Sequence, residues 1–190
     1  MQIQTLSSKY AAGRHWDNHP NIYAKYFGDF LRRNLFNGEI VDIGCGCGRD
    51  VEALNSFGYQ TMGIDKSPQE IRSARNKRPR SLFAVMDAER LAFADGSIGA
   101  FYMINVIHYV DAVKVIAEMH RTLRSRGFLF IHFNLSITDQ NGNVDYQLSE
   151  HEVWRLFPAF RAMGQKYFSR FDPIPFPHQH DVLQLIFKKL

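Results

Sequence analysis

The chain has 190 residues, of which 45% are hydrophobic and 22% are charged, and its formal net charge is +4. This length suits one domain with a full hydrophobic core and is short for two. The mild positive charge tolerates an anionic substrate or weak contact with nucleic acid and requires neither. No apolar run reaches the roughly 20 residues that span a bilayer, and residues 1–20 lack the apolar core of a signal peptide, so we expect a cytoplasmic protein.

The two cysteines, Cys45 and Cys47, are separated by a single residue. Neighbours this close rarely form a disulfide, because the bridge requires a particular backbone geometry. A zinc site would need further ligands, and no second cysteine pair accompanies them. His178 and His180 would supply two ligands at most, so we predict reduced thiols and no metal.

Residues 1–20 are polar and irregular, and regular elements follow them. Apolar residues at helical spacing predict a helix over 22–35, ended by Gly38. Strands and helices then alternate, with strands expected over 40–44, 60–65, 81–87, 99–110 and 127–134, and helices over 49–58, 67–76 and 111–124. Ser67 and Asp111 are expected N-caps, and Pro68 suits a first helical position.

Residues 149–190 have a different pattern. Ser149 and Glu152 form the capping box of a helix over 149–160. Strands over 165–171 and 181–190 follow, and since no helix fits between them, the pair is expected to be antiparallel. The predicted fold class is α/β, Rossmann-like and doubly wound, with about seven mostly parallel strands, an antiparallel last strand, and helices on both faces.

A strand, a glycine-rich turn and a helix, as found over 39–54, form an element that binds nucleotides. The dinucleotide pattern G-x-G-x-x-G fits Gly44 and Gly46 but places Arg49 where its third glycine belongs. Read as D-x-G-x-G-x-G from Asp42 to Gly48, the loop fits throughout. In this form it resembles the first motif of class I S-adenosylmethionine (SAM)-dependent methyltransferases, and an NAD-linked oxidoreductase becomes a rival interpretation.

The resemblance extends over about residues 38–135. Within it, the sequence is similar to small bacterial methyltransferases of the ubiquinone/menaquinone and tellurite-resistance groups. It implies SAM as the cofactor, a single domain, and three parts: an N-terminal helical segment over the cofactor (1–37), a SAM-binding core (38–135), and a C-terminal helix with an antiparallel strand pair (136–190). One departure is Ser125-Arg126, where the family usually has Pro-Gly before strand five.

The resemblance also implies roles for individual residues. Asp42 would face the cofactor's ammonium group, Asp65 its ribose hydroxyls, and Asp87 its adenine amine. The cofactor-binding set expected from the resemblance is Asp42, Gly44, Cys45, Gly46, Asp65, Lys66, Met86, Asp87, Ala88, Asn105, Val106 and Ile107.

The residues of the acceptor side are less defined. In open α/β sheets ligands bind beyond the carboxyl ends of the strands, and the proline-rich connection over 172–180 is expected at that edge. This makes His178 and His180 candidates for the acceptor side, and His108 a candidate base. Tyr10, Arg14 and Trp16 belong to a segment that in relatives folds over the cofactor. The catalytic residue stays unassigned, because an activated methyl group needs positioning more than a base.

We expect a SAM-dependent methyltransferase that moves the methyl group to a small-molecule acceptor by in-line displacement. The sequence lacks the N/D-P-P-Y tetrad of base-amino methyltransferases, a Pro-Cys nucleophile, and an added RNA- or protein-binding domain. The alternatives are an RNA or protein methyltransferase and a SAM-binding protein without catalysis. Nucleic-acid binding is not favoured, since the basic run over 72–80 is expected to be solvated surface, and the protein is expected to be a monomer or homodimer.

Overall fold

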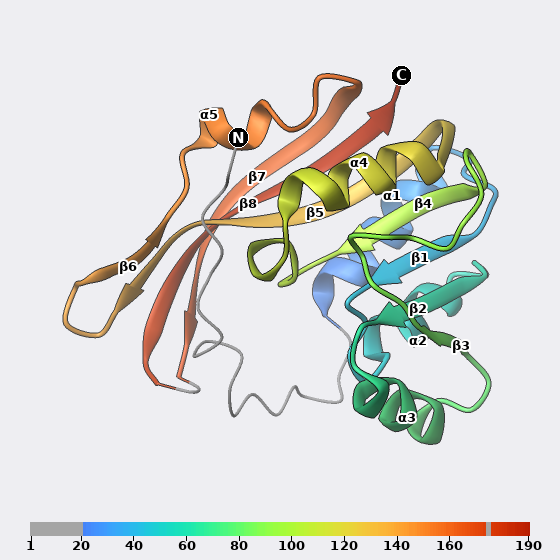
Figure 1. The fold of residues 1–190 in the computed structure, drawn as a ribbon, viewed down its shortest axis with the longest axis horizontal. Helices are drawn as coiled ribbons and strands as arrows, with labels where there is room; N and C mark the ends of the chain where they lie inside the picture. Colours follow the sequence, from blue (N-terminus) through green and yellow to red (C-terminus); the bar gives the residue numbers. More distant parts are fainter. Residues whose placement is uncertain (1–20, 174–175) are drawn as a thin grey trace.

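An eight-stranded mixed sheet forms the centre of the protein. The computed structural model describes residues 21–173 and 176–190. The strands lie in the order β3-β2-β1-β4-β5-β8-β7, and β6 pairs with β5 outside this path (Figure 1). Their bounds are β1 Ile40–Ile43, β2 Thr61–Asp65, β3 Leu82–Val85, β4 Ile98–Met103, β5 Leu123–Asp139, β6 Val144–Gln147, β7 Phe160–Asp172 and β8 His178–Lys189.

The strand directions confirm the predicted fold class. All neighbouring pairs from β3 to β5 are parallel. Strand β8 lies between β5 and β7 and is antiparallel to both. Strand β7 therefore runs with the parallel strands, and the last strand of the chain is reversed, as is the short β6.

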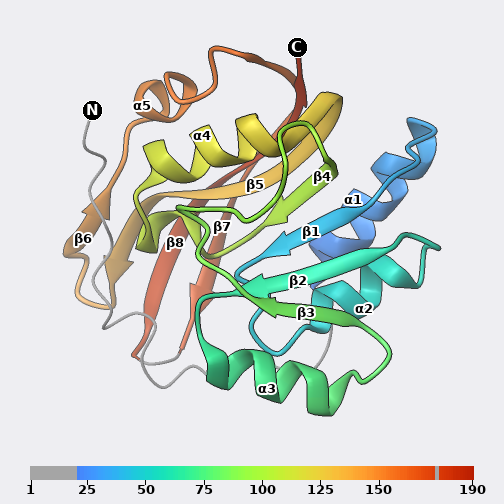
Figure 2. The ribbon, with the colours of Figure 1, turned by 45° about the vertical axis from the view of Figure 1, so that its right-hand side comes forward.

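Helices cover both faces of the sheet (Figure 2). Helices α1 and α2 pack on one face through Phe27, Leu31 and Leu54, whereas α4 and the segment around α5 pack on the other. Their bounds are α1 Ile22–Arg33, α2 Arg49–Asn55, α3 Pro68–Lys77, η2 Ile107–Tyr109, α4 Ala112–Thr122 and α5 Glu150–Trp154. In the described part of the chain, no helix is both long and apolar enough to cross a membrane.

The predicted helix starts are confirmed. The Ser67 hydroxyl accepts from the Glu70 amide, with Pro68 as the first residue of α3. The Asp111 carboxylate accepts from two amides in the first turn of α4. At α5, Ser149 and Glu152 form the full reciprocal capping box. Each cap satisfies amides that a helix start leaves without intrahelical partners.

The predicted end of the first helix is wrong. Helix α1 ends at Arg33, well before Gly38, and Asn34 is its C-cap. The Asn34 side chain donates to the Phe30 carbonyl, and Leu35 takes a left-handed conformation at φ 50°. The short polar side chain of Asn34 thus stabilises a helix end for which glycine was expected.

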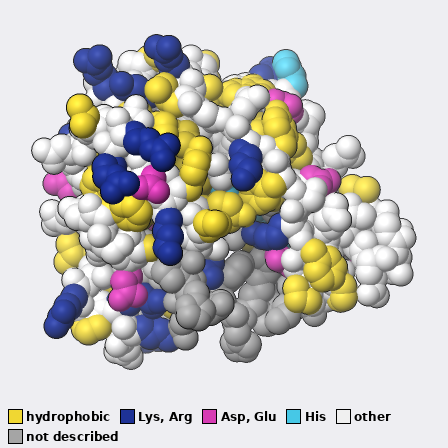
Figure 3. All heavy atoms as spheres, turned by 180° about the vertical axis from the view of Figure 1, so that it is seen from behind, with side chains coloured by type: hydrophobic (Ala, Val, Ile, Leu, Met, Phe, Trp, Pro, Cys, Tyr) yellow, Lys and Arg dark blue, Asp and Glu magenta, His cyan; other side chains and the backbone are white. Residues whose placement is uncertain are grey.

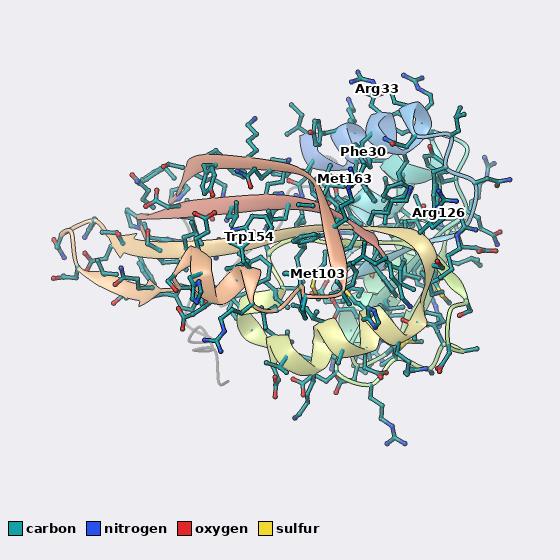
Figure 4. The ribbon with its side chains drawn as sticks, turned by 90° about the horizontal axis from the view of Figure 1, so that it is seen from above. Phe30, Arg33, Met103, Arg126, Trp154 and Met163 are labelled. Carbon is teal, nitrogen blue, oxygen red and sulfur yellow. The ribbon has the colours of Figure 1, made fainter. Side chains whose placement is uncertain are left out.

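Several other predicted elements are shorter than expected, β4 and α5 most of all. Strand β4 stops at Met103, where the sequence suggested a strand to residue 110, because Asn105 has a φ of 58° and a 3₁₀ turn follows. Helix α5 has five residues and carries Trp154, which is labelled in Figure 4. The Trp154 ring packs edge-on against Phe187, with 5.8 Å between the ring centroids.

The sheet continues past the carboxyl ends of β1 to β4. Strand β5 has 17 residues, more than twice the span expected, and its far end pairs with β6. The turn between them is closed by Asp139, whose Oδ1 accepts from the amides of Asn141 and Asn143. As Figure 1 shows, β5, β6, β7 and β8 together form an extension beyond the edge where the parallel strands end.

Candidate functional site

A cavity of about 490 Å³ lies at the carboxyl ends of β1, β2, β3 and β4. It is lined by all but one of the residues expected to hold a cofactor: Asp42, Gly44, Cys45, Gly46, Asp65, Lys66, Met86, Asp87, Ala88, Asn105 and Val106. Ile107 is the exception, because its side chain is buried in the hydrophobic core. Parallel strands end at one edge, so residues far apart in sequence converge here.

The glycine loop between β1 and α2 packs so closely against its neighbours that two of its glycines have no room for a side chain. A Cβ atom at Gly44 would stand 2.2 Å from a methyl group of Val106, and one at Gly48 would stand 2.4 Å from the Phe83 ring. Gly46 differs, since a Cβ there would meet nothing closer than Glu70 at 3.8 Å. Its φ of 51° nevertheless disfavours other residues, and a side chain there would extend into the space beside the loop.

Asp65, the last residue of β2, fastens the glycine loop. Its Oδ2 accepts from the Gly46 amide at 3.1 Å, and its Oδ1 accepts from the Ser67 amide at 2.8 Å. An ionised carboxylate offers about four lone-pair positions, so two donors leave capacity for hydroxyl groups of a ligand. Asp87, an exposed residue just beyond the end of β3, accepts from the Glu89 amide at 2.9 Å and also lines the cavity.

Asp42 supplies a buried carboxyl group to the cavity wall, with 4% of its surface exposed. Burial raises its pKa well above the usual value, nearby Asp50 raises it further, and Arg49 partly opposes both. Asp50 is itself held by the Asn21 amide at 2.7 Å and the Tyr102 hydroxyl at 3.3 Å. A cationic group entering the cavity would favour the ionised form of Asp42.

The cysteines of the loop are packing residues. In the described structure both are free thiols and both are buried. Burial raises the pKa of the Cys45 thiol, so it is neither a thiolate nor a ready nucleophile. The Cys47 backbone, in contrast, is engaged, because its carbonyl accepts from Arg78 at 2.7 Å.

Arg78 supports the glycine loop from outside the cavity, and sequence reasoning missed this role. We expected the run over 72–80 to be solvated, but Arg78 is buried and joins the Cys47 carbonyl to the carboxylate of Glu52. No spacing rule singles it out from the exposed Arg72 and Arg80. On the face seen in Figure 3, Lys and Arg side chains are interspersed with other types and do not form one continuous stripe.

Arg170 is a second such residue, and it connects the cavity with the sheet extension. Its Nη1 donates to the Asn105 side-chain oxygen at 3.1 Å, and its Nη2 donates to Asp172 at 2.9 Å. The Nε2 atom of His180 lies 3.2 Å from the same Asp172 oxygen. A polar path therefore runs from Asn105 in the cavity wall to the start of β8.

The three candidate histidines are all buried. His178 and His180, considered as part of a connection, belong to the first residues of β8 and are 1% exposed. His108 is 4% exposed, lies outside the cavity wall, and has the Asn134 amide nitrogen within 3.3 Å of its ring. Tyr10, Arg14 and Trp16 lie outside the described residues.

Comparison with known proteins identifies the region that carries this cavity. A family model described as "Methyltransferase domain" matches residues 41–131. The 2-methyl-6-phytyl-1,4-hydroquinone methyltransferase of Synechocystis sp. is 31% identical over 97 residues, which is 48% of this chain and 30% of that protein. The mitochondrial ubiquinone biosynthesis O-methyltransferase of Schizosaccharomyces pombe is 32% identical over 102 residues, covering 53% of this chain and 35% of that protein.

Solved structures share the fold over most of the chain. A SAM-dependent methyltransferase from Methanosarcina mazei has a TM-score of 0.72 at 21% identity, covering 84% of this chain and 97% of that one. TehB from Haemophilus influenzae has a TM-score of 0.69 at 12% identity, covering 87% of this chain and 62% of that one. The sequence relatives, by contrast, are matched over about a third of their length. These findings confirm the resemblance drawn from the glycine loop.

Proposed function

We propose that this protein transfers the methyl group of SAM to a small-molecule acceptor, because residues 41–131 match a methyltransferase domain and the chain shares its fold with a SAM-dependent methyltransferase. The observation that carries the proposal is the convergence of the glycine loop, Asp42, Asp65 and Asp87 on one cavity. SAM supplies a methyl group that its sulfonium already activates. The task left to the protein is to hold the cofactor, align the acceptor and exclude water.

The residues of the cavity fit the chemical groups of SAM. Asp42 offers a buried carboxylate to the ammonium group, and its cost of ionisation falls when a cation lies beside it. Asp65 retains acceptor capacity for the ribose hydroxyls while it holds the Gly46 amide. Asp87, with Met86 and Ala88 beside it, suits the adenine ring and its amino group.

The acceptor is proposed to enter beside Asn105, from the side of the sheet extension. Asn105 lines the cavity and is held by Arg170, so the methyl end of the cofactor would face β7 and β8. His178 and His180 lie along that side, whereas His108 is separated from the cavity by its burial in the 3₁₀ turn. Two of the sequence relatives are named for quinone-related small molecules, which supports an acceptor of that size.

Binding and turnover test the proposal separately. Calorimetric titration is expected to give one SAM site per chain, and incubation with fractionated small metabolites is expected to release S-adenosylhomocysteine. SAM binding without product from any pool would instead support a SAM-binding protein that does not catalyse transfer. Product formed only with RNA, with strongly salt-dependent binding, would move the acceptor to nucleic acid.

A further inference from the structure

Three potential metal ligands meet where β7 ends and β8 begins. One ligand atom from each of Asp172, His178 and His180 lies within 4.8 Å of the other two. The strand pairing makes the cluster, because Asp172 stands opposite His178 and Arg170 stands opposite His180. From the sequence we expected no metal, because His178 and His180 alone would supply two ligands at most. Sequence spacing does not reveal that the Asp172 carboxylate lies beside them.

We propose that Asp172, His178 and His180 bind one divalent transition-metal ion of the Zn²⁺ class. Two imidazoles and one carboxylate are a common protein donor set for such ions, and they leave a coordination position open. The site lies outside the cofactor cavity, and ion binding there does not depend on the proposed methyl transfer.

The histidines are arranged as ligands usually are. The Nδ1 atom of His178 lies 2.6 Å from the Phe176 carbonyl oxygen, which can only accept, so the proton is on Nδ1 and the lone pair is on Nε2. Metal-bound histidines are typically oriented in this way by a carbonyl or carboxylate at the other ring nitrogen. His180 is equally buried, and among the described residues neither of its ring nitrogens has a well-formed hydrogen bond.

The spacing of the donors also suits an ion. The His180 Nε2 and Asp172 Oδ2 atoms are 3.2 Å apart. Neighbouring ligand atoms of a tetrahedral zinc site, with bonds of about 2.0–2.2 Å, stand roughly 3.3–3.5 Å apart. The pair therefore needs little movement to hold an ion between its members.

Arg170 holds the carboxylate from outside the cluster. It donates to Asp172 at 2.9 Å, as second partners of ligating carboxylates commonly do, and its other arm reaches Asn105. The ion would thus lie on the acceptor side of the cavity. There its open position would suit an oxygen, nitrogen or sulfur atom of the acceptor, and this role, unlike binding itself, rests on the proposed function.

Metal titration of the chelator-treated, untagged full chain without SAM tests the site. We expect one saturable equivalent of Zn²⁺ by calorimetry, and of Co²⁺ by visible absorption bands typical of low coordination number. His178→Gln and His180→Gln should each weaken binding by more than about 10-fold. His151→Gln, at an exposed histidine of α5, and Cys47→Ala, in the thiol pair, should leave it unchanged.

Asp172→Asn provides a second test in case the variants of the buried histidines do not fold, because Asp172 is partly exposed. It should remain folded without metal and lose the rise in melting temperature that Zn²⁺ causes in the wild type. Absence of saturable binding to the wild-type chain, or equal binding by Asp172→Asn, would overturn the proposal. A separate SAM titration of the same samples shows whether SAM still binds when the metal ion does not.

Discussion

At the scale of single residues, Gly46 and Cys47 are neighbours with opposite importance. A side chain at Gly46 would adopt an unfavourable φ and extend into the space beside the loop, whereas Cys47 contributes a carbonyl and a small buried thiol. We therefore expect Gly46→Val to abolish SAM binding and Cys47→Ala to keep the affinity within a few-fold, as measured by calorimetry. A large loss from the cysteine change would point to redox or metal chemistry in the loop.

Because of Asp42, we expect the affinity for SAM to depend on pH. Its raised pKa means that the free protein holds a proton there up to a higher pH than an ordinary aspartate would. The cofactor's ammonium group favours the ionised form, so affinity should fall as pH is lowered through that pKa, and binding should release protons. Asp50, Arg49 and Asp65 are the charged neighbours that set the exact position.

Calorimetry in buffers of different ionisation enthalpy measures the protons released. In Asp42→Asn the pH dependence should disappear, and affinity at high pH should be lower than in the wild type. An unchanged pH profile in this variant would assign the titration to another group.

We predict that Arg78 contributes to the free energy of unfolding and that the exposed Arg80 does not. Replacing it by methionine removes the donor to the Cys47 carbonyl in a buried setting, which should lower the free energy of unfolding by about 1–3 kcal/mol. Arg80→Met, at an exposed position, should change it by less than about 0.5 kcal/mol. Denaturant unfolding measures both, and equal effects would contradict a fastening role for Arg78.

At the scale of elements, α3 starts directly from the cofactor site. Its N-cap Ser67 accepts from the Glu70 amide through its side chain, and its own amide donates to Asp65. Ser67→Ala should therefore lower the free energy of unfolding by about 1 kcal/mol, and Ser67→Asn should restore most of it. Thermal unfolding followed by circular dichroism compares the two, and an alanine variant as stable as the wild type would show that the cap adds nothing.

The other element with consequences is the sheet extension. Strand β5 continues past the edge of β4 because it gains partners there: β8 along most of its length and β6 at its end. Buried side chains such as Ile137 and Tyr146 give this hairpin its own share of the core. The residues between β5 and α5 therefore continue the sheet beyond the carboxyl ends of β1 to β4.

At the scale of the whole molecule, the ligand is expected to stabilise the fold. A ligand present at 100 times its dissociation constant adds about 2.7 kcal/mol to the stability of the native state. For a chain of this size, that corresponds to a rise in melting temperature of roughly 5–10 °C. SAM should produce this rise in melting temperature and NADH should not. The reverse result would support the rival interpretation, in which the glycine loop binds a dinucleotide.

The local sequence determined the parts of this protein that depend on interactions within a few residues. The caps at Ser67, Asp111 and Ser149 were predictable in this way, and so was the glycine loop. The meeting of Asp42, Asp65, Asp87 and Asn105 was also predictable, since the carboxyl ends of parallel strands share one edge.

Only the tertiary structure decided which distant side chains complete the site. Arg78 reaches a carbonyl 31 positions away, and Arg170 reaches Asn105 across 65 positions. The grouping of Asp172 with His178 and His180 likewise depends on the register of β7 against β8. Sequence patterns report the period of an element and the residues next to it, whereas these contacts follow from strand pairing and from which buried polar groups still need a partner.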